Sequence, residues 1–413
     1  MPALEAVVKS ALSKSPRTMA WDFELLSARY QQMMSSSPLY PQVGAGYQYQ
    51  VRDESRSEGL EPGLYDRGIY SITATQSLWH WGAVRAAAKV GELGTLIAEQ
   101  NLESVRRALA LEVRNSYMGL IVQKVGVRNA QFSEKLMKEN LERQEVRYKA
   151  ELITLSALFD IRLRTEEAIL AGERAASDLE FAVRAFRQLT GVATFTVNDI
   201  PENLAAPKNE STSLEVGTAT GYLKSESLLI NELQIEQGRL SQKIDRKALW
   251  PKLNLMVGVS QDDNLYSTSL GERITTVSSF VGLQLQWTIF DGFASRGRRL
   301  QSKNRLLQLE NARDNLIESI EDSADQQAQH VGFAWRAYLH ARQRREGAAG
   351  GVAYEKDNLA RGQSSEEQIA NAQAALNQAE LVEIDALARF YSASARYAST
   401  LQADPLIDGK IEN

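Results

Sequence analysis

The sequence predicts a mostly α-helical protein with a small β part, built as a tandem repeat, and three observations lead to this fold class. Proline is absent from two long tracts, between Pro62 and Pro201 and between Pro251 and Pro405. Because proline in a helix interior costs about 3 kcal/mol, such tracts permit very long helices. Within both tracts apolar residues recur every three or four positions, as on one face of a helix. Short segments of alternating apolar and polar residues follow Pro41 and Pro251, and alternation is typical of a strand with two unlike faces.

Length and composition are those of an ordinary folded protein. The chain has 413 residues, 43% of them hydrophobic, and a formal net charge of −5. This charge gives no basic field that would attract nucleic acid, so we expect no nucleic-acid partner. The absence of cysteine excludes disulfides, thiolate metal sites and cysteine nucleophiles. The best apolar stretch, 118–127, is too short and too polar to cross about 30 Å of hydrocarbon, so we expect no helical membrane span.

The first half of the chain, residues 1–190, combines a helix, two strands and a helical hairpin. Its expected elements, in order, are a helix over 3–36, strands over about 43–52 and 69–79 with a polar loop (52–68) between them, and a long helical hairpin over about 82–190. Because residues 1–4 already enter the helical pattern, we expect no secretion signal in the residues shown. The first arm of the hairpin ends near Tyr148, and after a break near Ala150 the second arm ends before Gly191.

Residues 223–402 repeat this plan. Their expected elements, in order, are a helix over about 222–249, strands over about 253–262 and 277–290 with a polar loop (261–273) between them, and a helical hairpin over about 292–400. The hairpin breaks at "GQSS" (362–365), and its second arm carries an alanine-rich seam with an average apolar spacing of 3.5 residues, which indicates a coiled coil. Residues 191–222 form an irregular linker between the halves, and 403–413 form a C-terminal tail.

The two halves correspond at a nearly constant offset. Tyr40–Pro41 matches Trp250–Pro251 at an offset of 210, whereas the second strand of each pair requires 211, because a slip of one residue would exchange its two faces. Four strands in a sheet leave two edges, which hydrocarbon does not tolerate. If the apolar face meets lipid, the sheet must close between chains, and three chains of four strands make a twelve-stranded barrel.

The order of these elements resembles the TolC-type outer-membrane efflux protein family, also called outer-membrane factors. The resemblance covers essentially the whole chain, and its most specific parts are the strand-to-helix junctions "QSLWHWG" (76–82) and "WTIFDG" (287–292) and the tandem repeat. The segments 147–160 and 361–380 are similar to the family's two hairpin tips. The resemblance implies a homotrimer with a twelve-stranded β-barrel in outer-membrane lipid, a periplasmic tunnel of coiled-coil hairpins, and an equatorial collar. It also implies two partners, a periplasmic adaptor and an inner-membrane pump of the resistance-nodulation-division or ATP-driven class.

Two sets of candidate functional residues follow. Members of the family often place acidic residues at the tunnel mouth and a glycine followed by an aliphatic residue at each tip. This chain has Ala150–Glu151 and Gly362–Gln363 at the tips. The candidates for the tunnel mouth and tips are Ser156, Asp160, Glu366, Glu367, Gln368 and Asn371, for which a solvated helix surface is the alternative. The candidates for the lipid face of the barrel are Tyr47, Val257, Leu283, Leu285 and Ile289.

The remaining polar residues suggest no chemistry. His80 stands between Trp79 and Trp81, where an interfacial or structural role is expected. His330 and His340, ten residues apart, are expected on opposed faces of one helix, with no metal-ligand spacing. The basic run at 296–305 is expected either to contact phospholipid headgroups or to be an ordinary solvated helix start. We therefore expect no catalytic residue, no cofactor and no metal site.

The sequence favours a passive exit duct for efflux or type I secretion, located in the outer membrane with a large periplasmic part. The alternative is a soluble coiled-coil scaffold or adaptor protein whose two hairpins form a small sheet. A scaffold has no need of strands that alternate in the same phase in both halves. The cargo is not predicted, because a duct takes much of its selectivity from its pump.

Overall fold

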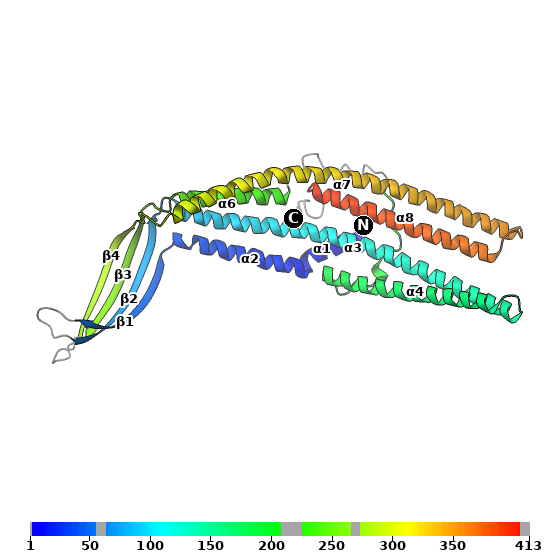
Figure 1. Cartoon of the computed structure of the whole chain (residues 1–413), viewed down its shortest axis with the longest axis horizontal. Helices are drawn as coiled ribbons and strands as arrows, with labels where there is room; N and C mark the ends of the chain where they lie inside the picture. Colours follow the sequence, from blue (N-terminus) through cyan, green and yellow to red (C-terminus); the bar gives the residue numbers. More distant parts are fainter. Residues whose placement is uncertain (1, 55–62, 208–224, 266–272, 405–413) are drawn as a thin grey trace. The chain divides into compact units, whose positions relative to one another are not determined.

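The computed structural model describes residues 2–54, 63–207, 225–265 and 273–404 (Figure 1). The α-helices are α1 (Pro2–Lys14), α2 (Pro16–Ser36), α3 (Ala83–Lys149), α4 (Leu155–Thr190), α6 (Glu226–Arg246), α7 (Ala294–Ala360) and α8 (Glu366–Thr400). The strands are β1 (Gln42–Glu54), β2 (Gly63–Trp79), β3 (Lys252–Leu265) and β4 (Arg273–Gln286), and two 3-10 turns are η1 (Ser37–Leu39) and η2 (Val197–Asp199). None of the described helices is long and apolar enough to cross a membrane.

The chain forms two compact units, and neither coincides with one half of the sequence. Unit 1 comprises Met1–Phe23, Asn101–Leu229 and Asn315–Asn413, and unit 2 comprises Glu24–Gln100 and Ile230–Asp314. Each unit therefore takes one set of segments from each half of the repeat. Residues that correspond by the repeat consequently pack within the same unit.

Unit 2 contains one antiparallel sheet of four strands in the order β1-β2-β3-β4. Val43 of β1 pairs with Ala74 of β2, Ala74 with Val257 of β3, and Val257 with Val281 of β4. Because side chains alternate along each strand, this register places all the odd-numbered residues of β1, β3 and β4 on the same face. The even-numbered residues of β2 lie on that face too, as far as the register shift between Ser77 and Trp79, so the sequence alternation becomes a property of the sheet.

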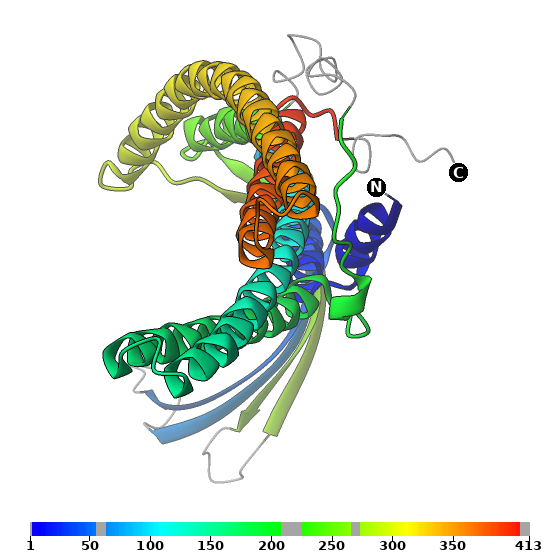
Figure 2. The same ribbon diagram turned by 90° about the vertical axis from the view of Figure 1, so that its right-hand side faces the viewer.

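Unit 1 is a layer of helices in the order α4-α3-α8-α7 (Figure 2). Glu145 of α3 pairs with Arg162 of α4 at 2.8 Å, and Arg128 of α3 pairs with Glu380 of α8 at 2.9 Å. Phe390 of α8 packs in a cluster of buried residues that includes Val331 of α7. Within this unit, α1 and residues 191–207 lie on one side of the layer (Figure 2). The largest hydrophobic core is on that side, where α1 packs on α3 and α4.

The N-terminal segment differs from the single helix expected over residues 3–36. It consists of α1 and α2, separated at Ser15. Pro16 is the first residue of α2 and has no N–H to donate back into α1, so the first helix ends there. The Ser15 hydroxyl accepts a hydrogen bond from the Arg17 backbone N–H at 3.3 Å and so starts the second helix.

The strand boundaries also differ from expectation. The fourth strand was expected over 277–290, but β4 begins at Arg273 and ends at Gln286. β4 ends where its partner β3 begins, because Gln286 pairs with Lys252, and beyond that pair the Trp287 indole donates to the Leu249 carbonyl at 3.0 Å. β1, β2 and β3 extend into the segments expected as loops, because ladder pairing continues along polar residues. The parts of those loops at 55–62 and 266–272 lie outside the described residues, as do linker residues 208–222 and tail residues 405–413.

The tandem repeat is visible in the backbone itself. Among the described residues, eight have a positive φ: Trp81, Gly82, Glu151, Gly191, Gly292, Phe293, Gly362 and Gln402. They form four pairs at an offset of 211, namely Trp81 with Gly292, Gly82 with Phe293, Glu151 with Gly362, and Gly191 with Gln402. Each pair contains one glycine and one other residue. The offset found from the strands therefore holds from the strand-to-helix junctions to the ends of both hairpins.

Candidate functional site

The sheet presents an exposed apolar face. Its side chains are Val43, Ala45, Tyr47, Tyr49 and Val51 of β1; Tyr70, Ile72 and Ala74 of β2; Leu253, Leu255, Val257 and Val259 of β3; and Val277, Val281, Leu283 and Leu285 of β4. We call this set the apolar sheet face. Leu283 and Leu285 are each 66% exposed. Such a contiguous apolar surface indicates contact with lipid or with another protein.

Four of the five predicted lipid-face residues lie on the apolar sheet face, and one does not. Tyr47, Val257, Leu283 and Leu285 share the face through the strand register. Tyr47 stacks against its direct partner Tyr70, with ring centroids 4.6 Å apart. Ile289 is the exception, because β4 has ended three residues earlier and Ile289 belongs to no strand. Extending the alternation through "WTIF" was therefore an error.

The opposite face of the sheet is more polar. Its side chains include Gln48, Arg67, Thr73, Asn254, Asp262 and Ser278. Arg67 of β2 forms an ion pair with Asp262 of β3, with a distance of 2.9 Å between Arg67 Nε and Asp262 Oδ1. Phe280 covers Gly258, its direct partner, so closely that a Cβ on Gly258 would lie 2.7 Å from the ring. The two faces thus have different chemistry across all four strands.

The junction between β2 and α3 is a cluster of aromatic and polar contacts. The Trp81 indole donates to the Pro251 carbonyl at 2.7 Å and packs edge-on against Trp250 at 4.7 Å. His80 Nε2 lies 2.8 Å from Asn254 Oδ1, and Lys247 donates to the Trp81 carbonyl at 2.6 Å. His80 thus makes a structural contact between β3 and the junction, in keeping with the structural role that the sequence favours for it.

Asp291 organises the corresponding junction in the second half. Its Oδ2 accepts from the Ser295 backbone N–H at 2.8 Å and from the Ser295 hydroxyl at 2.5 Å, and it lies 3.4 Å from Arg298. The Ser295 hydroxyl above all, and then the Ser295 N–H and the Arg298 guanidinium, hold the pKa of Asp291 below its usual value. Arg298 is thus part of the helix start. Two other members of the basic run, Arg299 and Lys303, line a small cavity with Arg246 of α6.

The two hairpin tips have the same backbone. In the first, Glu151 has φ 58° and the Leu152 N–H donates to the Arg147 carbonyl at 2.9 Å. In the second, Gly362 has φ 72° and the Gln363 N–H donates to the Asn358 carbonyl at 2.8 Å. The tip of the first hairpin is therefore Glu151–Leu152, one residue later than the Ala150–Glu151 assignment. Each tip retains one part of the glycine–aliphatic pattern, Leu152 in the first and Gly362 in the second.

The predicted tunnel-mouth residues all lie in the first turns after these tips and are all exposed: Ser156 and Asp160 in α4, and Glu366, Glu367, Gln368 and Asn371 in α8. Gln368 completes a capping box, because its Oε1 accepts from the Ser365 N–H at 2.8 Å. Its side chain is therefore occupied in starting α8. At the equivalent place in the first half, the Thr154 hydroxyl caps α4 by accepting from the Ala157 N–H at 3.3 Å.

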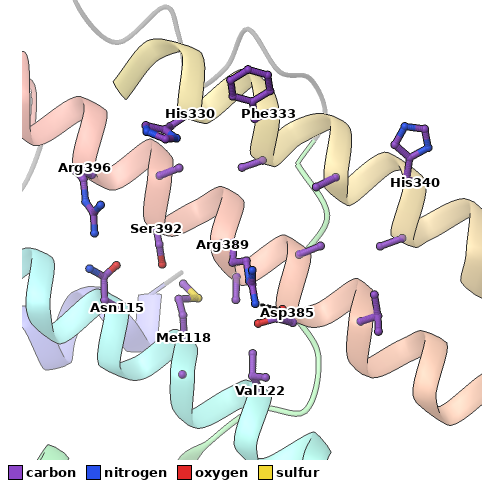
Figure 3. Close-up of a pocket in the computed structure, with 18 of the residues that line it drawn as sticks. Asn115, Met118, Val122, His330, Phe333, His340, Asp385, Arg389, Ser392 and Arg396 are labelled. Atoms are coloured by element: carbon purple, nitrogen blue, oxygen red, sulfur yellow. Dashed lines mark ion pairs between the residues drawn. The ribbon is translucent and has the colours of Figure 1, made fainter. Parts of the chain in front are cut away.

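Sequence reasoning missed a groove in unit 1 with a volume of about 1020 Å³, which lies between α3, α7 and α8 (Figure 3). We call it the arginine groove. Its ionisable lining residues are His330, His340, Arg344, Asp385, Arg389 and Arg396. Asp385 and Arg389 form an ion pair at 2.9 Å. His330 and His340 line the same groove, so the expectation of opposed faces is wrong: ten residues advance roughly 1000°, which leaves the two about 80° apart. No metal-binding group of three or more residues occurs in the described part of the chain.

The fold and these surfaces define a class of protein: a chain that joins a four-stranded sheet with an exposed apolar face to two equivalent helical hairpins. Residues 7–192 match the family model for outer membrane efflux proteins. No curated protein matches the sequence significantly.

Solved structures resemble nearly the whole chain in fold. The outer membrane protein VceC from Vibrio cholerae is 13% identical over 97% of this chain and 96% of that chain, with a TM-score of 0.71. The CmeC outer membrane channel of Campylobacter jejuni is 13% identical over 97% of this chain and 86% of that one, with a TM-score of 0.77. The MtrE outer membrane channel of Neisseria gonorrhoeae, in its open state, is 17% identical over 95% of this chain and 89% of that chain, with a TM-score of 0.63.

The resemblance to the TolC-type outer-membrane efflux proteins is thereby confirmed, by sequence over residues 7–192 and by fold over nearly all of the chain. The predicted fold class, mostly helical with four strands per chain, is confirmed with it. The matching family model describes outer membrane efflux proteins, and CmeC and MtrE are outer membrane channels.

Proposed function

We propose that three copies of this chain form the outer-membrane exit duct of a tripartite efflux or type I secretion machine, through which cargo passes passively. The apolar sheet face carries this proposal. Leu283 and Leu285 are largely exposed in the single chain, and they belong to an apolar face that runs in register across all four strands. The other reading, a soluble scaffold, gives no reason for this face. In the proposed trimer it meets lipid, and twelve strands close the sheet without free edges.

The edges of the helix layer in unit 1 support closure between copies. α4 exposes a stripe of large apolar residues, of which Phe159, Leu163 and Leu170 are 59%, 61% and 66% exposed. α7, at the other edge, has Gly347, Gly350 and Gly351, and the space beyond each of these glycines is open. Leu163 lies about two turns from the tip end of α4, and Gly350 about three turns from the tip end of α7. We infer that the α4 stripe of one copy packs into the glycine surface of the next, a head-to-tail contact that closes into a ring.

The absence of cysteine makes this contact directly testable. The double variant Leu163→Cys/Gly350→Cys should form disulfide-linked dimers and trimers on mild oxidation of outer membranes. Each single variant serves as its control and should remain free of trimer. A cross-linked double variant would support the ring, whereas a soluble, monomeric protein from the native precursor would refute the duct and favour the scaffold.

We infer that the two hairpin tips face the periplasmic adaptor, and through it the inner-membrane pump. The Leu152 side chain, 67% exposed beside the left-handed Glu151, offers the apolar contact of the first tip. Ser156, Asp160, Glu366, Glu367, Gln368 and Asn371 then surround the tunnel mouth. We also infer that the chain divides into repeats 1–190 and 223–402, a linker 191–222 and a tail 403–413. The constant offset of 211 in the backbone supports this division.

A further inference from the structure

We propose that the arginine groove binds amphipathic organic anions, molecules with an apolar body and a sulfonate, carboxylate or phosphate group. This inference rests on the proposed function, because in a duct it would make the tunnel wall at this level selective for anions. The observation behind it is a reversal of charge. The chain as a whole carries a formal charge of −5, yet three arginines and one aspartate line the groove.

The arginines are free to act on a ligand. Arg389 pairs with Asp385, but its side chain is 76% exposed and retains donors that face open space. Arg396 and Arg344 are also exposed, and no acidic side chain in the described part of the chain forms an ion pair with either. The planar guanidinium presents paired N–H groups that match the oxygens of a carboxylate, sulfonate or phosphate. The lining of the groove therefore has a net positive charge.

The opposite wall of the groove supplies the apolar contact. In Figure 3, Arg389, Ser392 and Arg396 point from α8 toward α3, and Asn115, Met118 and Val122 point back from α3. Met118 and Val122 are apolar and lie beside the arginines, where the body of an amphipathic ligand would rest. The Asn115 Oδ1 atom is buried and has no hydrogen-bond partner in the described part of the chain. A ligand hydroxyl or amide would satisfy it.

The position of the groove within unit 1 is consistent with a tunnel wall. α1 and residues 191–207 cover one side of the helix layer, and the arginine groove opens on the other side (Figures 2 and 3). Gln378 and Asn371 precede the groove residue Asp385 in α8 by seven and fourteen residues, so helix periodicity places these polar, uncharged residues on the same side. Repeated three times in a ring, the groove would form a basic belt in the wall.

The test uses two probes with the same apolar body and opposite charge, naphthalene-2-sulfonate and 2-naphthylmethylammonium. Calorimetry on the purified, detergent-solubilised protein should detect binding of the sulfonate and at least tenfold weaker binding of the ammonium. Arg389→Gln/Arg396→Gln should weaken the sulfonate at least tenfold. Arg342→Gln/Arg361→Gln removes the same charge from residues outside the groove and should change the Kd of the sulfonate less than twofold. Asp385→Asn, which releases Arg389 from its ion pair, should tighten binding of the sulfonate severalfold.

A second measurement applies to the assembled duct. In planar bilayers under a KCl gradient, the reversal potential should show that the channel prefers chloride to potassium. The Arg389→Gln/Arg396→Gln variant should lose this preference, and Asp385→Asn should increase it. Equal binding of the two probes, or sulfonate binding that ignores the arginines, would overturn the proposal. Channels whose ion selectivity is the same in all variants would also contradict it. If no channel forms, the duct itself is refuted, and the binding measurement still decides the chemistry of the groove.

Discussion

At the scale of single residues, the repeat shows where the backbone is strained. Glu151 and Gly362 have the same left-handed conformation at equivalent tips, but only glycine adopts it without steric cost. A residue with a Cβ carries about 1–2 kcal/mol of strain in this region. The two halves have thus kept the backbone geometry and exchanged the residue that suits it.

Exchanging these residues should move stability in opposite directions. Glu151→Gly should stabilise the chain by about 0.5–1 kcal/mol, because relief of strain exceeds the greater flexibility of glycine in the unfolded chain. Gly362→Ala should destabilise it by about 1 kcal/mol. Thermal unfolding followed by circular dichroism measures both. Ala150→Gly is the control, since Ala150 has no positive φ and should lose stability on the same change. Destabilisation by Glu151→Gly would show that its side chain contributes more than the strain costs.

At the scale of elements, long helices depend on how they start. α3 and α7 each have 67 residues, and each follows two successive left-handed residues, Trp81–Gly82 and Gly292–Phe293. The first turn of α7 is held by Asp291, which accepts two hydrogen bonds from Ser295. At the first junction, the position that corresponds to Asp291 is occupied by His80. The His80 Nε2 atom lies 2.8 Å from Asn254 Oδ1 of β3.

This helix start should depend on pH. The folded-state pKa of Asp291 is lowered, chiefly by the Ser295 hydroxyl, so the ionised carboxylate adds stability above the unfolded pKa of about 3.9. That contribution is lost as the pH falls through the lower folded pKa. Asp291→Asn should therefore unfold at a lower temperature than the wild type at pH 7, and the difference should disappear in strong acid. A difference that is the same at every pH would show that the charge of Asp291 is not what stabilises α7.

At the scale of the whole molecule, the two faces of the sheet differ in the surroundings that they suit. Val257 lies in the middle of β3 on the apolar sheet face, whereas Ser278 of β4 lies on the polar face. An arginine on a lipid-facing strand costs about 2–4 kcal/mol at the middle of the bilayer, and one on the lumen side costs little.

The pair Val257→Arg and Ser278→Arg compares the two faces directly. Val257→Arg should greatly reduce the yield of detergent-resistant trimer in the outer membrane, and Ser278→Arg should leave the yield near that of the wild type. Semi-native electrophoresis of outer-membrane extracts measures both. Equal yields would mean that the apolar sheet face does not contact lipid.

Much of this architecture could be predicted from local sequence. The 3.5-residue spacing of Ile369 to Tyr397 predicts α8, and the shared phase of Val43 and Leu253 predicts that both hairpins turn apolar side chains to one face. Some boundaries could not be predicted in this way. Alternation continues through "WTIF", but β4 ends at Gln286 because its partner strand begins at Lys252, and Trp287 instead donates to the Leu249 carbonyl, 38 residues away in sequence.

The sequence by itself determined the elements, their order, the repeat and the resemblance to a family, because helix and strand periodicity and proline positions act within a few residues of each other. Only the tertiary structure decided which distant residues meet. Arg389 and Arg396 face Asn115, Met118 and Val122 because α8 packs beside α3, and no local pattern records that neighbourhood. The arginine groove was therefore invisible in the sequence, where its arginines are ordinary charges on a helix surface.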